Sequence, residues 1–116
     1  VVDDEKDILK MLALEAEDFE GLELNFAHNG KEALALLEVN KYDALITDLR
    51  MPLMGGIDLL KEIRSQSIDF KTVFVASGHP KEHHAEDLNG LGPFEYIQKP
   101  YDPYAVLGKI VSEISI

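Results

Sequence analysis

Short apolar runs alternate with longer amphipathic segments along this chain. Runs containing β-branched or aromatic side chains lie at positions 22–27, 44–47, 72–76 and 94–97. Runs of that length and composition predict buried strands. Val1-Val2 predicts a further strand, already under way where the sequence starts. Because there is also no initial methionine, we expect additional residues upstream.

The segments between the apolar runs predict helices. Asn29 with Glu32 three residues later resembles a capping box, and Asp102 before Pro103 resembles an N-cap followed by proline at the first helical position. Five strand–helix units with short connections predict a parallel sheet with helices on both faces. The apolar helical faces are formed by Ile8, Leu9, Leu12, Ala16 and Phe19, by Leu59, Leu60 and Ile63, and by Val106, Leu107, Ile110 and Ile114.

Composition narrows the class of protein. The 116 residues suffice for one domain, which we expect to span residues 1–116. Without cysteine, the chain forms no disulfide, iron–sulfur cluster or thiolate zinc site. A net charge of −11 argues against direct nucleic-acid binding, which depends on clustered lysine and arginine. No apolar run approaches the ~20 residues of a membrane span and no signal peptide is evident, so we expect a cytoplasmic protein with no membrane partner.

Acidic residues follow two of the predicted strands. Asp3 and Asp4 come directly after Val2, and Asp48 comes directly after the run 44–47. In a sheet of strand order 2-1-3-4-5, the carboxyl ends of the first and third strands flank the crevice where strand order reverses. Carboxylates in one crevice raise each other's pKa values unless a cation compensates, and oxygen-only ligands suit magnesium. The sequence therefore predicts a magnesium site with one carboxylate left for chemistry.

Two further polar groups belong to the same predicted edge. Ser77 follows the fourth predicted strand, and Lys99 follows the fifth. A metal, an acceptor, a hydroxyl donor and a cation are the parts that phosphoryl transfer requires. Taken singly, each has a simpler interpretation: Asp3 and Asp4 could cap the first helix, and Lys99 could be a surface lysine. Their combination favours phosphoryl transfer.

Four motifs occur in order at the predicted strand ends. They are Val1-Val2-Asp3-Asp4-Glu5, Asp48-Leu49-Arg50-Met51-Pro52 with Gly55-Gly56, Val75-Ala76-Ser77-Gly78 and Tyr96-Ile97-Gln98-Lys99-Pro100. Together they resemble the receiver domain of bacterial two-component response regulators, nearly end to end. The resemblance implies a flavodoxin-like (βα)5 fold, a doubly wound parallel sheet of order 2-1-3-4-5 in three α/β/α layers. It also implies a phosphorylation-dependent signalling switch. Such a domain catalyses its own phosphotransfer and dephosphorylation but is not a conventional enzyme.

The resemblance implies a role for each matching acid. Asp48 is the expected phosphoacceptor, taking a phosphoryl group from the phosphohistidine of a histidine kinase. Asp3, Asp4 and Asp48 are expected to hold Mg²⁺, for which Mn²⁺ could substitute. The backbone carbonyl of Arg50 is expected to complete the protein ligands.

The other motif residues are expected to respond to phosphorylation. The resemblance implies that Ser77 hydrogen-bonds the phosphoryl oxygens, and that Lys99 pairs with Asp48 at rest and with the phosphoryl group afterwards. Tyr96 matches the aromatic switch position, expected to rotate inward when Ser77 moves, although an aromatic residue ending a strand also suits a simple rim position. A cis peptide bond is expected between Lys99 and Pro100.

Some positions depart from the family pattern or vary within it. Gly55 stands where the family commonly has aspartate, and Pro93-Phe94-Glu95 replaces the usual small and acidic residues before the switch aromatic. Arg50 and His79 lie two residues after the acceptor and two after the switch hydroxyl. The resemblance implies that these two positions tune the lifetime of the phosphoryl group.

The resemblance also implies partners. A histidine kinase or phosphotransfer protein is the expected donor. An output domain or partner protein is expected on the face formed by the fourth helix, the fifth strand and the last helix, and phosphorylation is a possible trigger for a homodimer. Ala85 and Leu88 are the only apolar anchors in residues 80–89, so we expect this fourth helix to be the least firmly packed.

Two alternative functions remain. A magnesium-dependent phosphohydrolase of the haloacid dehalogenase type also uses an aspartate nucleophile, but it needs a second acid two residues later, where this chain has Arg50. A degenerate receiver that acts by contact alone is disfavoured by the intact acids together with Ser77 and Lys99.

The histidines suggest a transition-metal site only weakly. His79 and His83 are four residues apart, a spacing that suits metal binding. However, Pro80 lies between them at a predicted helix start, and a third ligand is not evident. We therefore expect His79, His83 and His84 on a solvated face.

Overall fold

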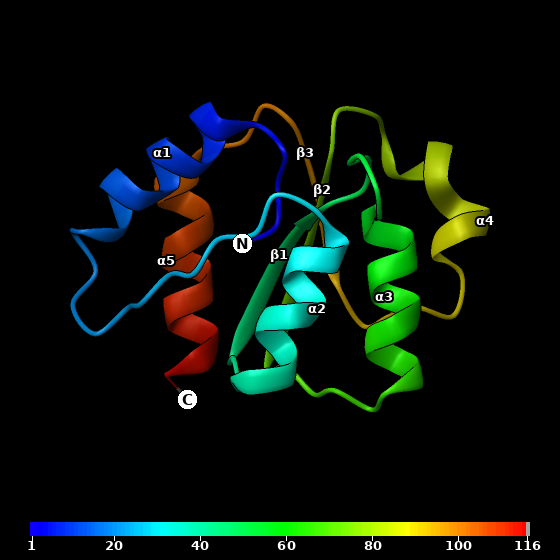
Figure 1. The fold of residues 1–116 in the computed structure, drawn as a ribbon. Coiled ribbons are helices and arrows are strands. Elements are labelled where there is room, and N and C mark those ends of the chain that lie inside the picture. Colours follow the sequence, from blue (N-terminus) through cyan, green and yellow to red (C-terminus); the bar gives the residue numbers. More distant parts are fainter. Residues whose placement is uncertain (116) are drawn as a thin grey trace.

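A parallel sheet runs through the centre of the molecule in the computed structural model, which describes residues 1–115 (Figure 1). Its strands are β1 (Ala44–Asp48), β2 (Thr72–Ser77) and β3 (Glu95–Gln98), hydrogen-bonded side by side in that order. Asp48 is level with Ala76, and Ser77 is level with Gln98, so the carboxyl ends of the strands meet at one edge.

Two N-terminal segments extend this sheet beyond β1. Val2 bridges Ala27 on one side and Thr47 on the other, both in parallel. Its N–H donates to the Ile46 carbonyl at 2.8 Å, and its carbonyl accepts from Asp48 N–H at 2.9 Å. The chain order across the sheet is therefore the predicted 2-1-3-4-5. The first two strands are shorter than predicted, since each is reduced to a single bridging residue, Val2 or Ala27.

The segment 22–27 shows why that prediction was too long. Leu22, Leu24 and Phe26 are only half-buried, and the residues between them are exposed. Ala27 alone bridges Val2, at the outer edge of the sheet. An edge segment has a partner on one side only, so an apolar alternation does not oblige it to pair along its whole length.

Helices cover both faces of the sheet. Figure 1 shows α1 (Lys6–Ala16) and α5 (Pro103–Ile114) on one side, with α2 (Gly30–Val39) and α3 (Gly56–Ser65) on the other. A hydrophobic core lies on each face of the sheet. Alternate strand residues contribute to one core or the other, because successive side chains point to opposite faces. Leu45 and Val75 pack with Leu59, Leu60 and Ile63, while Ile46 and Phe74 pack with Val106 and Ile110.

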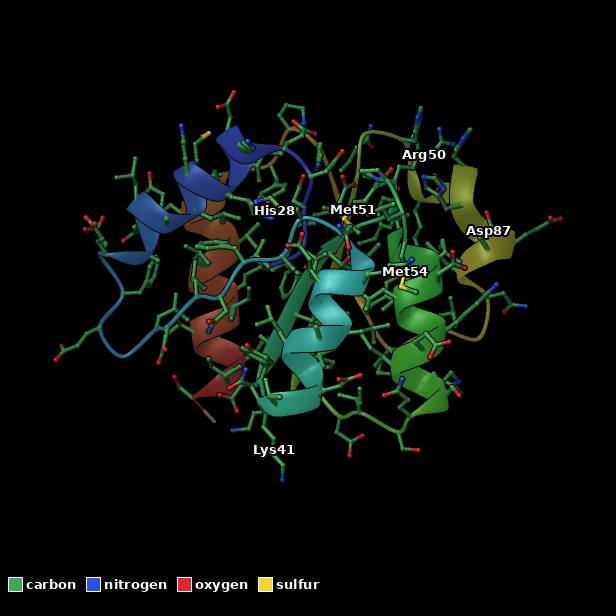
Figure 2. All side chains as sticks on the ribbon, in the orientation of Figure 1. His28, Lys41, Arg50, Met51, Met54 and Asp87 are labelled. Carbon is green, nitrogen blue, oxygen red and sulfur yellow. The ribbon has the colours of Figure 1, made fainter. Side chains whose placement is uncertain are left out.

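The predicted helix starts are present. The Asn29 side chain accepts from Glu32 N–H at 3.0 Å, and Asp102 accepts from Tyr104 N–H at 3.0 Å. The return bond of the capping box is shifted by one residue, since the Glu32 carboxylate accepts from His28 N–H instead of from the N-cap. The loop after β1 rests on the start of α2, where Gly30 N–H donates to the carbonyl of Met54, a residue labelled in Figure 2.

The fourth helix differs from the prediction. In place of one helix over residues 80–89, the chain forms a short 3₁₀ helix, η1 (Lys81–His84), and a single helical turn, α4 (Ala85–Leu88). Leu88 is buried as predicted, but Ala85 is exposed, so it is not an anchor. The second inward residue is His84. Too few apolar residues mark this segment for the sequence to fix which side faces inward.

Candidate functional site

Three carboxylates meet at the carboxyl edge of the sheet. Asp3 follows the bridging Val2, and Asp48 is the last residue of β1. One side-chain oxygen from each of Asp3, Asp4 and Asp48 lies within 4.8 Å of the other two. Asp3 and Asp48 are buried, whereas Asp4 is exposed. These three acids were predicted to share one crevice, and the structure places them together.

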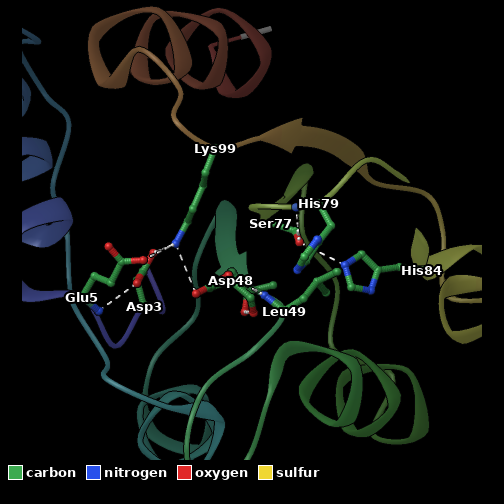
Figure 3. A network of polar contacts seen from close by, with 9 residues as sticks. Asp3, Glu5, Asp48, Leu49, Ser77, His79, His84 and Lys99 are labelled. Carbon is green, nitrogen blue, oxygen red and sulfur yellow. Dashed lines mark hydrogen bonds and ion pairs between the residues drawn. The ribbon is translucent and has the colours of Figure 1, made fainter. Parts of the chain in front are cut away.

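Lys99 lies among these acids (Figure 3). Its Nζ is 2.9 Å from Asp3 Oδ2 and 3.2 Å from Asp48 Oδ2. A third carboxylate, that of Glu5, lies 3.2 Å from the same Nζ. The Lys99 N–H donates to the Ser77 carbonyl at 2.7 Å, which ties the loop after β3 to the end of β2, and the bond from Lys99 to Pro100 is cis.

Glu5 was not among the predicted site residues. Its backbone N–H donates to Asp3 Oδ1 at 2.9 Å, and this turn brings its carboxylate back toward Lys99. The signal available in the sequence was the third consecutive acid after Asp3 and Asp4.

The crowding of charge alters proton affinities. Burial raises the pKa of Asp48, and the negative charge of Asp3 raises it further, against the opposing effect of Lys99. Burial alone would lower the pKa of Lys99, but its hydrogen bonds and ion pairs with Asp3 and Asp48 outweigh burial and raise it. Burial and the charge of Asp3 raise the pKa of Tyr101 to about 12. Lys99 therefore stays a cation, whereas the ionised form of Asp48 is destabilised by its surroundings.

The two carboxylate oxygens of Asp48 have different partners. Oδ1 accepts from the backbone N–H of Leu49 at 2.9 Å, while Oδ2 faces Lys99. The carboxylate also lines a cleft of about 640 Å³ with Asp4, Arg50 and Ser77. A buried carboxylate with one face on a cleft suits a nucleophile that an incoming group has to reach.

Ser77 is buried at the end of β2. Its Oγ lies 3.0 Å from Nε2 of His84 and accepts from the His79 N–H at 3.2 Å (Figure 3). The expectation of three solvated histidines holds for His79 and His83, which are exposed, but is wrong for His84, which is buried. Burial lowers the pKa of His84, and the neighbouring His83 lowers it further.

Tyr96, Arg50 and His79 are the remaining predicted site residues, and the last two line the cleft. The hydroxyl of half-buried Tyr96 donates to the His79 carbonyl. Arg50 is exposed, and its guanidinium lies 3.4 Å from Nε2 of His83. The expected lifetime-tuning residues Arg50 and His79 thus belong to the rim of the cleft on the η1 side.

The donor set decides which cation this site suits. Within residues 1–115, Asp3, Asp4 and Asp48 are the only three side chains of a metal-ligating type whose donor atoms converge. All three offer oxygen, which favours a hard divalent ion. The rings of His79 and His83 stack 4.5 Å apart at 21°, so they lie face to face and do not aim their nitrogens at a shared point.

Comparisons with known proteins agree on one family. Residues 1–111 match the response regulator receiver domain. The chain is 32% identical over 110 residues to the response regulator SaeR of Staphylococcus aureus, covering 95% of this chain and 47% of that protein. The chain thus spans about half the length of the curated relatives it matches.

Solved structures give the same result. The receiver domain of Francisella response regulator 1452 is 31% identical, with a TM-score of 0.84 over 98% of this chain and 93% of that one. Chemotaxis response regulator CheY4 of Vibrio cholerae is 28% identical, with a TM-score of 0.82 over 96% of this chain and 92% of that one. In the described part of this chain, no helix has the length and apolarity to cross a membrane.

Proposed function

The chain belongs to the response regulator receiver domain family, whose members are phosphorylation-controlled signalling domains, and we propose that Asp48 is its phosphoacceptor. The observation that carries this assignment is the position of Asp48, which ends β1 beside Asp3 and lies 3.2 Å from Lys99 Nζ. Asp3 is also buried, paired with Lys99 and placed after a central strand position, but among the described residues that line the cleft only Asp48 has all three features.

The proposed reaction is a displacement at phosphorus. A carboxylate oxygen of Asp48 forms a bond to phosphorus while the bond from phosphorus to the donor's imidazole nitrogen breaks. The electron pair of that bond stays on the imidazole. Water later cleaves the acyl phosphate, releasing inorganic phosphate and restoring the Asp48 carboxylate.

We assign the cation site to the three converging acids, with Mg²⁺ as the ion and Mn²⁺ as a substitute. Asp3, Asp4 and Asp48 would bind it together with the backbone carbonyl of Arg50. When bound, the ion would offset the negative charge that the phosphoryl group brings into the cleft. A hard ion and oxygen donors are mutually suited, which supports this assignment.

The other residues act on the charge of the phosphoryl group. Lys99 supplies a fixed positive charge beside Asp48. Ser77 would donate its hydroxyl to a phosphoryl oxygen, and Tyr96 would move inward as Ser77 leaves its present position. Arg50 and His79, on the rim of the cleft, would control how readily water reaches the acyl phosphate.

The partners we propose follow from the family. A histidine kinase or phosphotransfer protein would donate the phosphoryl group, in the cytoplasm. The face formed by η1, α4, β3 and α5 would meet an output domain, a partner protein or a second copy of the chain. Residues 1–116 would act as one receiver domain.

The direct experiment is phosphorylation by acetyl phosphate followed by intact-mass spectrometry. We expect the parent chain to gain the mass of one phosphoryl group when magnesium is present and not when it is chelated. Asp48→Asn should gain none, while Asp69→Asn, at an exposed loop acid, should behave as the parent does. Equal uptake by Asp48→Asn and the parent would refute the assignment.

A further inference from the structure

His84 is a buried histidine in contact with the proposed switch. Its exposed fraction is 5% and that of Ser77 is 3%. Nε2 of His84 lies 3.0 Å from Ser77 Oγ, and the His79 N–H donates to the same oxygen at 3.2 Å. Figure 3 shows the serine hydroxyl between these two partners, on the opposite side of Asp48 from Lys99.

The hydroxyl has one hydrogen and two acceptor positions. The N–H of His79 occupies one acceptor position. If Nε2 of His84 carries no proton, it takes the serine hydrogen; if it carries one, it occupies the second acceptor position. In both cases the Oγ of Ser77 is held toward the η1 side of the cleft, and in the first case its hydrogen is also committed to His84, so that another acceptor has to compete for it.

His84 also adjoins the proposed aromatic switch. The ring centroids of His84 and Tyr96 are 6.4 Å apart. The Tyr96 hydroxyl donates to the His79 carbonyl, which ties this ring to the loop after β2. One buried imidazole thus adjoins both residues that have to move if the domain is to switch.

We propose that His84 is a positioning residue that stabilises the resting conformation by holding the hydroxyl of Ser77. This inference rests on the proposed function, because it requires a phosphoryl group on Asp48 to compete for that hydroxyl. Ser77 then exchanges its bond with His84 for a bond with a phosphoryl oxygen. The loss of that bond releases η1, which is where the signal enters the proposed output face.

The charged and titratable groups around His84 are consistent with this role. They are His83 on η1, His79 after β2, Arg50 after β1 and Asp87 on α4. All but Asp87 oppose a positive charge on His84, as its burial does. A neutral imidazole beside a serine hydroxyl forms an ordinary hydrogen bond, which a charged phosphoryl oxygen outcompetes.

The size of the effect follows from one hydrogen bond present in the resting state only. Removing it shifts the equilibrium toward the switched state by the net contribution of that bond. For a neutral pair this changes the equilibrium constant between the resting and switched states by about 2- to 12-fold.

The test uses beryllium fluoride with magnesium as a stable substitute for the phosphoryl group, followed by ¹H–¹⁵N NMR. His84→Leu keeps a side chain of similar volume but removes the hydrogen bond. We expect it to reach half-conversion at an about 2- to 12-fold lower beryllium fluoride concentration than the parent. His83→Leu, at the exposed neighbouring histidine, should leave the midpoint where it is. In a Ser77→Ala background, His84→Leu should have no effect.

Two further measurements do not depend on how well His84→Leu folds. His84→Gln can still bond Ser77 through its side-chain amide, so its midpoint should return toward that of the parent. In the parent, the ¹⁵N signals of the His84 ring should change when beryllium fluoride binds, because Nε2 loses its partner. A parent that binds with unchanged His84 signals, or a His84→Leu midpoint equal to or above the parent's, would overturn the role of His84 alone. A parent that binds no beryllium fluoride would overturn the proposed function as well.

Discussion

At the scale of the residue, the buried carboxylate of Asp48 is held in an unfavourable state of charge. Its pKa is raised in the folded chain, first by burial and then by Asp3, above the ordinary 3.8. At pH values between 3.8, the ordinary pKa, and the raised pKa of folded Asp48, the folded chain binds more protons than the unfolded chain. The free energy of unfolding therefore falls as pH rises through this window. Above this window the ionised Asp48 destabilises the fold to its full extent, and below pH 3.8, where Asp48 is protonated in both states, this destabilisation disappears.

The first prediction is therefore that Asp48→Asn stabilises the metal-free protein at pH 7, by about 1 kcal/mol. Asparagine keeps the shape and an acceptor for Leu49 N–H but removes one repelling charge. The gain should shrink as pH falls through the raised pKa of Asp48. Urea unfolding in the presence of a chelator measures it, with Asp69→Asn as the exposed control. A less stable Asp48→Asn at pH 7 would contradict the account.

Lys99 gives the second prediction. Lys99→Met keeps most of the stem but leaves Asp3, Asp48 and Glu5 without their shared cation. Breaking a largely buried ion pair from one side leaves uncompensated charge, and we expect a loss of about 2–3 kcal/mol in the free energy of unfolding without magnesium.

Magnesium should recover part of the Lys99→Met loss by binding the folded form, as thermal melts would report. The control is Lys109→Met, because Lys109 pairs with Glu95 on the exposed surface. Such surface pairs contribute less than about 1 kcal/mol. Equal losses in the two variants would mean that the cleft is not an electrostatically strained site.

At the scale of the element, the turn from β1 into α3 has no room for a side chain. A Cβ added at Gly56 would lie 2.2 Å from the carbonyl oxygen of Asp48, which is backbone and therefore cannot rotate away. The third prediction is that Gly56→Ala destabilises the fold by about 2–4 kcal/mol and also slows phosphorylation, because the strand end carrying Asp48 has to shift.

Gly108 is the matched control for Gly56. It lies within α5, where an added Cβ would come no closer than 3.9 Å to the Phe19 ring. Alanine in a helix interior is favoured over glycine, so Gly108→Ala should stabilise the chain by about 0.5–1 kcal/mol. Chemical denaturation of both variants gives the comparison, and a neutral Gly56→Ala would show that the turn is not tightly packed.

Elements with strong local signals were predicted well. Asn29 and Asp102 cap the helices that their sequence contexts indicate, because a cap depends on residues within three positions. The chain order of the sheet follows from the alternation of strands and helices. The contribution of His84 could not be predicted, since its burial depends on a 3₁₀ turn that aims it at a strand 7 residues earlier in the chain.

The partners of Lys99 show a second limit. The sequence indicates that Lys99 ends a strand near Asp48, but a pattern does not determine how one cation divides among three carboxylates. Asp3 and Lys99 are 96 positions apart, and the 2.9 Å contact between them exists only because the whole sheet has formed. Local chemistry thus indicated Asp3, Asp48 and Lys99 but not Glu5, and the contacts of all four depend on tertiary geometry.

At the scale of the whole molecule, the sheet brings four distant segments to one edge. The acids come from the first strand position and β1, the hydroxyl from β2, and the ammonium from the loop after β3. No one of these segments holds the complete chemistry by itself. A phosphoryl group on Asp48 would face groups from all of them, so a local chemical event can be transmitted to η1, α4 and β3.

The measurement that tests this account most directly is to locate the phosphoryl group. The chain is phosphorylated with acetyl phosphate and magnesium, reduced with borohydride, which converts an aspartyl phosphate to homoserine, and then digested and sequenced by mass spectrometry. We predict homoserine at position 48 only, and none when magnesium is chelated. Homoserine at position 3 or 4, or an unmodified Asp48 in a chain that has gained a phosphoryl group, would contradict the central claim.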